Sequence, residues 1–208
     1  PLDSVEPIRF EDLFSLDEIQ TIQDGFAKAT GVASIITTVD GTPITKPSNF
    51  CRLCSDIIRK TEKGCINCYT SDAALGQYHP DGPIIHPCMS SGLWDAGASI
   101  SVGGKHIANW LVGQVRDETQ TEEAMRDYAR KIGADETDFM DAFHEVPAMS
   151  HEQFEHVAQS LFTLANQLST TAYQNVQQAR FITERKQAEA DMESLAKFPA
   201  ENPYPVLR

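Results

Sequence analysis

The segment that begins at Ser150 carries the longest regular pattern in the chain and limits what the rest can fold into. Apolar residues recur there at spacings of three and four as far as about Ala196, which is the period of an amphipathic α-helix. Ser150 followed by Gln153 is typical of a capping box that opens a helix. One unbroken helix of this length would measure on the order of 65–70 Å. Because the preceding residues cannot cover such a length, the pattern predicts either a parallel coiled-coil linker or two shorter helices with a break.

The charge and composition exclude several classes of protein. The chain has 17 basic and 30 acidic residues and a net charge of −13, the opposite of the clustered Lys and Arg that bind nucleic acid or anionic lipid. No apolar run approaches the roughly 20 residues of a membrane span, and no signal peptide is visible. An odd count of 5 cysteines in a chain of 208 residues favours reduced or metal-bound thiols in the cytoplasm.

The residues before Ser150 alternate between helical and strand patterns. Ser15 and Glu18 form a capping box ahead of a helix that Gly31 should end. Gly103-Gly104 between two apolar runs predicts a two-residue hairpin turn. Gly64 should end the helix that begins at Cys51. We expect strands at 32–39, 84–88, 96–102 and 106–115, and further helices at 51–61, 65–78, 122–132 and 138–143. The sequence therefore predicts an α+β fold, with an antiparallel sheet flanked by helices and a long C-terminal helix.

All five cysteines lie in one short window, as Cys51-x-x-Cys54, Cys65-x-x-Cys68 and Cys88. Thiolate pairs at this spacing are compatible with zinc or with an iron–sulfur cluster. They are equally compatible with buried thiols that line a pocket, because free cysteine is among the most buried residue types. A disulfide that switches with redox state is a third alternative, so the residues alone leave the cofactor open.

A catalytic cysteine is the less favoured interpretation. His86 lies two positions before Cys88 and would face the same side of a strand. A cysteine nucleophile also needs a group that orients its base, and no third member is apparent. The sequence contains no Gly-rich phosphate loop, nucleophile elbow or kinase signature. A binding module is therefore favoured over an enzyme that uses a Cys–His nucleophile or a metal-bound water.

The expected strands contain an unusual set of polar or amphipathic side chains: Trp94, Asp95, Asn109, Trp110 and Gln114. Buried amides and carboxylates are costly unless they are paired, so each has either an internal hydrogen-bond partner or a ligand. Asn109 and Gln114 are an odd number of residues apart, so a regular strand would point them to opposite faces. Both can face one side only if a bulge lies near Gly113. With Cys54, Cys68, His86 and Cys88, this set forms the candidate pocket for a small polar ligand.

Short motifs in a fixed order carry a family resemblance. They include Ala27-x-x-Thr30-Gly31-Val32, Asp40-Gly41-x-Pro43-Ile44-Thr45, Cys68-x-x-Ser71-Asp72, Gly92-Leu93-Trp94-Asp95-Ala96-Gly97-Ala98 and Gly113-Gln114-Val115. Over residues 8–168 the chain resembles the PocR sensory-domain family. Cys54, Cys68 and Cys88 fit that family's pattern better than Cys51 and Cys65. The resemblance implies a PAS-like sensory fold that detects a small hydrocarbon derivative such as a diol or an alcohol.

The tail carries a second resemblance. Residues 182–189 resemble the helical linker between PAS modules and kinase cores, and residues 198–208 resemble the opening of a PAS domain. We therefore expect a sensory domain at 8–168, a helical linker at 169–196 and the start of a PAS-like domain at 197–208. The resemblance implies that the parent is a sensor histidine kinase. The apolar seam of the long C-terminal helix needs a partner to bury it, so we expect a parallel homodimer through that helix.

Overall fold

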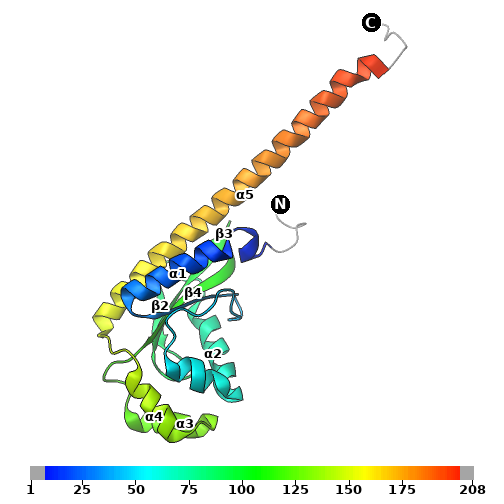
Figure 1. The fold of residues 1–208 in the computed structure, drawn as a ribbon. Helices are drawn as coiled ribbons and strands as arrows, with labels where there is room; N and C mark the ends of the chain where they lie inside the picture. Colours follow the sequence, from blue (N-terminus) through cyan, green and yellow to red (C-terminus); the bar gives the residue numbers. More distant parts are fainter. Residues whose placement is uncertain (1–7, 202–208) are drawn as a thin grey trace.

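A four-stranded antiparallel sheet, ordered β1-β4-β3-β2, forms the centre of the molecule (Figure 1). We describe a computed structural model that covers residues 8–201. The strands are β1 (Ala33–Thr37), β2 (Ile84–Pro87), β3 (Trp94–Val102) and β4 (Lys105–Val115). With helices on both sides, this is the expected α+β, PAS-like fold.

Helices of different lengths cover the two faces of the sheet. The helical elements are the 3-10 turn η1 (Phe10–Asp12), α1 (Leu16–Thr30), the π-helical turn η2 (Leu53–Ile57), the 3-10 turn η3 (Ile58–Lys60), α2 (Glu62–Leu75), α3 (Glu122–Ile132), α4 (Glu136–Glu145) and α5 (His151–Glu201). Helices α1 and α5 lie side by side over one face, and α2 lies over the other (Figure 1). Helices α3 and α4 pack beside η2 at one end and form a second apolar cluster there.

Alternation along β3 separates the two faces. Ala96, Ala98 and Ile100 are buried in the main core against α5. Gly97 faces α2, where a Cβ atom would lie 2.4 Å from the backbone oxygen of Leu75. Glycine at this position therefore lets α2 approach the sheet closely.

Most of the expected glycine breaks are confirmed, and one is wrong. Gly103 and Gly104 have φ angles of 56° and 83°, as a tight hairpin turn requires, and Gly31 ends α1 with a φ of 77°. Gly133 ends α3 in the same way, with a φ of 76°. Gly64 does not end a helix. It lies in the first turn of α2, where its N–H donates to Thr61 Oγ1 at 3.1 Å. A Cβ there would lie 2.3 Å from the carbonyl oxygen of Ile58. The glycine is therefore needed because the start of α2 lies so close to the Ile58 backbone, and it does not end a helix.

The two predicted capping boxes have different outcomes. Ser150 Oγ accepts a hydrogen bond from the backbone N–H of Gln153 at 3.2 Å, which is one of the two hydrogen bonds of the expected capping box. Ser15 occupies the N-cap position of α1, but its side chain makes no capping hydrogen bond. The start of α1 therefore depends on its packing and backbone hydrogen bonds.

Helix α5 is unbroken over its 51 residues, so the interpretation as two helices is wrong. At about 1.5 Å per residue it is about 75 Å long. Phe154, Leu161 and Ala172 are fully buried against the sheet, and contact with the core continues as far as Val176. The remainder projects from the body (Figure 1) and exposes apolar side chains at Phe181, Ile182, Met192 and Leu195.

The predicted domain limits stay predictions. The helix has no discontinuity at 168, where the sensory domain was expected to end, and the expected PAS-like start at 197–208 lies largely outside the described residues. Within residues 8–201, no helix combines the length and apolar composition needed to cross a membrane.

Candidate functional site

A cavity of about 30 Å³ lies between the sheet, α2 and the turn that follows Cys51. One water molecule needs at least about 10–15 Å³ by the same measure, so the space accepts about two waters or a molecule of very few heavy atoms. Its apolar wall includes Ile35, Leu75 and Leu111, which form a small buried cluster of their own. Its polar wall carries two carboxylates, one guanidinium, three thiols and several serine hydroxyls.

A β-bulge aims Asp95 at this cavity. Asp95 pairs with Gly113 and Trp94 pairs with Val115, which leaves Gln114 as the extra residue, with a φ of 60°. The backbone N–H of Gln114 donates to Asp95 Oδ1 at 2.8 Å. A Cβ on Gly113 would lie 2.0 Å from the same oxygen, so only glycine fits beneath the carboxylate. The bulge near Gly113 that the parity conflict predicted is thus confirmed.

Burial controls the protonation of Asp95. Removal from water raises the pKa of its carboxyl to about 7, although the Gln114 N–H and the Cys88 thiol both donate to it and lower that value. The charge of Asp72 nearby adds to the rise. At neutral pH, Asp95 therefore exists in both protonation states and can either donate or accept a hydrogen bond.

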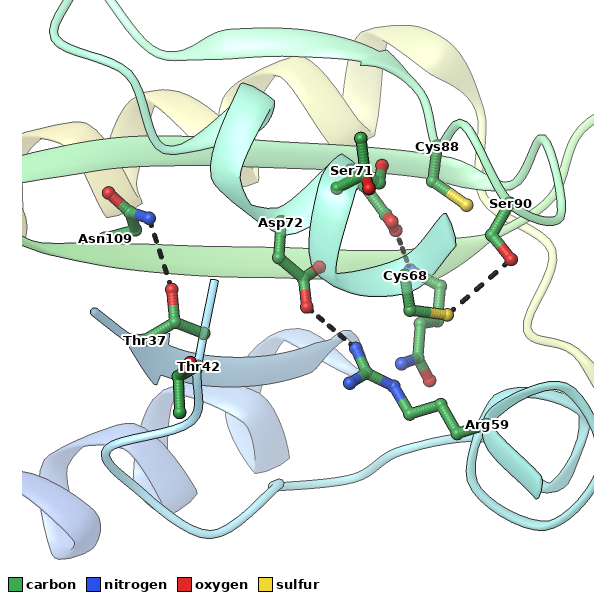
Figure 2. Close-up of polar contacts among 12 residues, drawn as sticks. Thr37, Thr42, Arg59, Cys68, Ser71, Asp72, Cys88, Ser90 and Asn109 are labelled. Atoms are coloured by element: carbon green, nitrogen blue, oxygen red, sulfur yellow. Dashed lines mark hydrogen bonds and ion pairs between the residues drawn. The ribbon is translucent and has the colours of Figure 1, made fainter. Parts of the chain in front are cut away.

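An ion pair between Arg59 and Asp72 forms the opposite wall (Figure 2). The Arg59 Nη2 to Asp72 Oδ2 distance is 2.9 Å, and the two side chains are 19% and 10% exposed. Burial raises the pKa of the Asp72 carboxyl, and the guanidinium offsets part of that rise. The Nε atom of Arg59 is buried and makes no hydrogen bond with any described residue. Arg59 lines the cavity, and its guanidinium also lies over the rings of Phe50 and Tyr69, at 5.4 Å and 5.8 Å from the ring centroids.

Three cysteines line the cavity as neutral thiols. Burial raises the pKa of Cys68 to about 11 and that of Cys88 to about 12. A hydrogen bond to Cys51, together with burial, raises the pKa of Cys54. Cys68 contacts the Ser90 hydroxyl at 3.6 Å (Figure 2), and Cys88 contacts Ser91 Oγ at 3.1 Å. These three residues therefore lie at the pocket as buried thiols, one of the three alternatives that the sequence left open for the cysteines.

Cys51 and Cys65 differ from these three. The hydrogen bond from Cys54 lowers the pKa of Cys51, which is half-buried just outside the cavity. Cys65 lies on α2 beside Tyr69 and is also half-buried. Among residues 8–195, no three His, Cys, Asp or Glu side chains come together in a way that could hold a metal ion. The zinc or iron–sulfur hypothesis stays a prediction.

The two tryptophans lie away from the cavity, in or beside the core on the opposite face. Trp110 is fully buried and packs on Phe26, and its Nε1–H donates to Ser34 Oγ at 2.9 Å. Trp94 donates to Asp117 Oδ2 at 2.8 Å, and its ring packs on His151 at a centroid distance of 4.5 Å. Both indole groups therefore have internal partners.

Asn109 and His86 are also engaged by neighbours. The Asn109 amide donates to Thr37 Oγ1 at 3.2 Å (Figure 2) and to the Thr38 carbonyl at 2.9 Å. Its Oδ1 atom lies 2.7 Å from His106 Nε2. His86 Nδ1 lies 2.8 Å from the carbonyl oxygen of Pro87, and His86 is not among the residues that line the described cavity with Cys88. Of the predicted ligand set, Cys54, Cys68, Cys88, Asp95 and Gln114 meet at the cavity.

Sequence reasoning missed Arg59 and Asp72. Asp72 follows Cys68 by four positions, a spacing that places both side chains on one helix face, and this signal could have identified it. Arg59 carries no comparable signal, because it contacts Asp72 only after the chain has turned at Thr61.

Comparison with known proteins identifies the family of this chain. The family model described as "Sensory domain found in PocR" matches residues 12–173. The chain belongs to the PocR sensory-domain family. Regulatory protein PocR of Salmonella typhimurium (strain LT2) is 31% identical over 100 residues, which are 47% of this chain and 32% of that protein. The aligned region thus spans about a third of that relative. No solved structure matches the chain.

Proposed function

We propose that the PocR sensory domain described here is the input domain of a signalling protein and binds a small, uncharged, hydroxyl-bearing molecule in the cavity. The observation that carries this proposal is the unpaired Nε–H of Arg59 in a wall that also contains Asp95. A buried donor without a partner costs about 1–3 kcal/mol, which a ligand oxygen would recover. A hydroxyl group can accept from Arg59 and donate to Asp95, so short alcohols and diols fit both groups.

The charges of the cavity favour a neutral ligand. A carboxylate ligand would be repelled by Asp72 and by the ionised form of Asp95. Arg59 and Asp72 balance each other's charge, so neither of them is free to pair with an ionic ligand. The apolar wall at Leu75 and Leu111 favours a short hydrocarbon stem. The cavity size favours a ligand of few heavy atoms, and a larger one would require α2 to move.

The sheet offers a route from the cavity to the output. Asp95 lies on β3, and the next residue, Ala96, is buried on the face that packs against α5. The Ser101 N–H on the same strand donates to Ser169 Oγ of α5 at 2.9 Å. If β3 can adopt two positions, a ligand that binds one of them more tightly increases its population. Because α5 packs against β3, the position of α5 would shift with it.

The projecting part of α5 is proposed as the dimer contact and the output. Its exposed Phe181, Met192 and Leu195 have no body to pack against within the described chain, and a second copy of α5 would bury them. We place the domain in the cytoplasm, as input to a histidine kinase through a following PAS module. All five cysteines are free thiols, which suits that compartment.

A thermal-shift screen with short alcohols and diols tests the ligand. A molecule that binds the folded state raises Tm, and the rise grows with the logarithm of its concentration once that concentration exceeds Kd. Arg59→Lys keeps the charge opposite Asp72 but removes the Nε donor, so it should abolish the shift. His86→Ala changes a residue outside the cavity and should leave the shift intact. A shift that survives both Arg59→Lys and Asp95→Asn would place the ligand elsewhere.

A further inference from the structure

The Cys51-x-x-Cys54 pair has a geometry that the proposed ligand site does not use. The Cys54 N–H donates to the Cys51 carbonyl at 3.1 Å, and the Ser55 N–H donates to the same oxygen at 3.0 Å. This turn places the Cys54 thiol beside Cys51, where it lowers the pKa of the Cys51 thiol. Residues three apart in such a turn have Cα atoms within about 7 Å, which is inside the span that a disulfide can bridge.

The two sulfurs have different environments. Cys51 is half-buried, whereas Cys54 is only 6% exposed and lines the cavity. The thiol of Cys54 stabilises the thiolate of Cys51, and that thiolate is the form that attacks a disulfide. Cys68 and Cys88 are held as thiols by burial and have serine partners instead. Cys51 is therefore the attacking group and Cys54 the resolving group.

We propose that Cys51 and Cys54 form a reversible disulfide by exchange with a small disulfide such as oxidised glutathione. The Cys51 thiolate attacks one sulfur of the reagent, forms a mixed disulfide and releases one thiolate. Cys54 then loses its proton and attacks the Cys51 sulfur, which releases the second thiolate. The protein loses two electrons and two protons in total, and the reagent gains them as two thiols.

Oxidation would change the ligand cavity, an inference that rests on the proposed function. Closing the disulfide draws the Cys54 sulfur from the cavity wall toward Cys51. The backbone N–H of Cys51 donates to Gln114 Oε1 at 2.8 Å, and Gln114 is the bulge residue whose own N–H holds Asp95. Strain in the Cys51 turn therefore reaches the carboxylate through two hydrogen bonds, and we expect the disulfide form to bind ligand more weakly.

The first test measures the disulfide without any ligand. The full chain is equilibrated in glutathione buffers of graded ratio, quenched with an alkylating reagent and mapped by peptide mass spectrometry. We expect a Cys51–Cys54 disulfide that is fully reversed by reduced glutathione. In the reduced protein, Cys51 should alkylate at least about tenfold faster than Cys54, Cys68 or Cys88, as its greater thiolate fraction requires. Cys65→Ser, a change outside the cavity, should leave the disulfide unchanged.

Three results would overturn the disulfide: both thiols alkylated in the most oxidising buffer, glutathione retained on Cys51, or a different cysteine pair joined. This mapping uses the unaltered sequence, so it does not depend on whether a Cys51→Ser variant folds. The second test compares ligand-induced thermal shifts of the reduced and oxidised forms. Equal shifts would refute the coupling, whereas a ligand shift absent from both forms would refute the proposed function and leave the disulfide established.

Discussion

Replacing Asp95 with Asn should remove most of a specific pH dependence from the stability of this domain. The ordinary pKa of the carboxyl is 3.8, and burial raises it to about 7 in the folded state. Between these values the folded protein holds a proton that the unfolded chain has released, so stability falls as pH rises. The contribution of Asp95 is fully present below about pH 4 and is lost as pH rises through about 7.

The magnitude follows from the size of the shift. One pKa unit corresponds to about 1.4 kcal/mol, so a shift of roughly three units amounts to on the order of 4 kcal/mol. The asparagine side chain of the variant cannot titrate, and its carbonyl can still accept from the Gln114 N–H. Relative to the wild type, Asp95→Asn should therefore be stabilised by on the order of 4 kcal/mol more at pH 8 than at pH 4.

Urea unfolding of both proteins at a series of pH values, at one fixed protein concentration, measures this difference. Asp141→Asn is the matched control, because it makes the same change at an exposed position on α4, away from the cavity. A wild-type minus Asp95→Asn difference that stays constant from pH 4 to pH 8 would refute a buried, proton-binding Asp95.

Three further predictions concern the rest of the molecule. Gly97→Ala should destabilise the fold by about 1–3 kcal/mol, because the new Cβ would clash with the backbone oxygen of Leu75. Gly25→Ala on α1 is the control: the new Cβ enters open space and should stabilise the helix by about 0.5–1 kcal/mol. Urea unfolding measures both changes. Truncation after Ala179 keeps the buried part of α5 and should convert a dimer to a monomer in sedimentation equilibrium, and an undiminished dimer would move the interface to the body. Elemental analysis of the purified protein tests the metal hypothesis for the cysteines: about one zinc or one iron cluster per chain would support it, and metal-free protein would leave buried thiols.

The elements were predictable where a local pattern determined them. The helix at 122–132 and the hairpin at Gly103-Gly104 depend on capping glycines and apolar spacing, which are properties of short segments. The bulge at Gln114 was predictable because two polar residues of opposite parity cannot share a face of a regular strand. These signals are present in the sequence before any long-range contact forms.

The composition of the site was less predictable, because it depends on which helix covers which face. Both faces of β3 and β4 are buried, so alternation alone cannot tell whether Trp110 faces α1 and α5 or faces α2. Asn109 lies on the same face as Asp95 but is held by Thr37 and Thr38, which are more than 70 residues away along the chain. The pairing of Arg59 with Asp72 likewise depends on a turn whose geometry no spacing in the sequence specifies.

The continuity of α5 has a mechanical consequence. Its first half is fixed against β3, and about 25 residues beyond Val176 extend freely for roughly 37 Å. A rigid rod of that length pivoting at the sheet acts as a lever, so a tilt of about 5° at β3 would displace the tip by about 3 Å. A rearrangement of less than one ångström around the cavity would thus displace the far end of α5 by several times that distance, because the helix is unbroken.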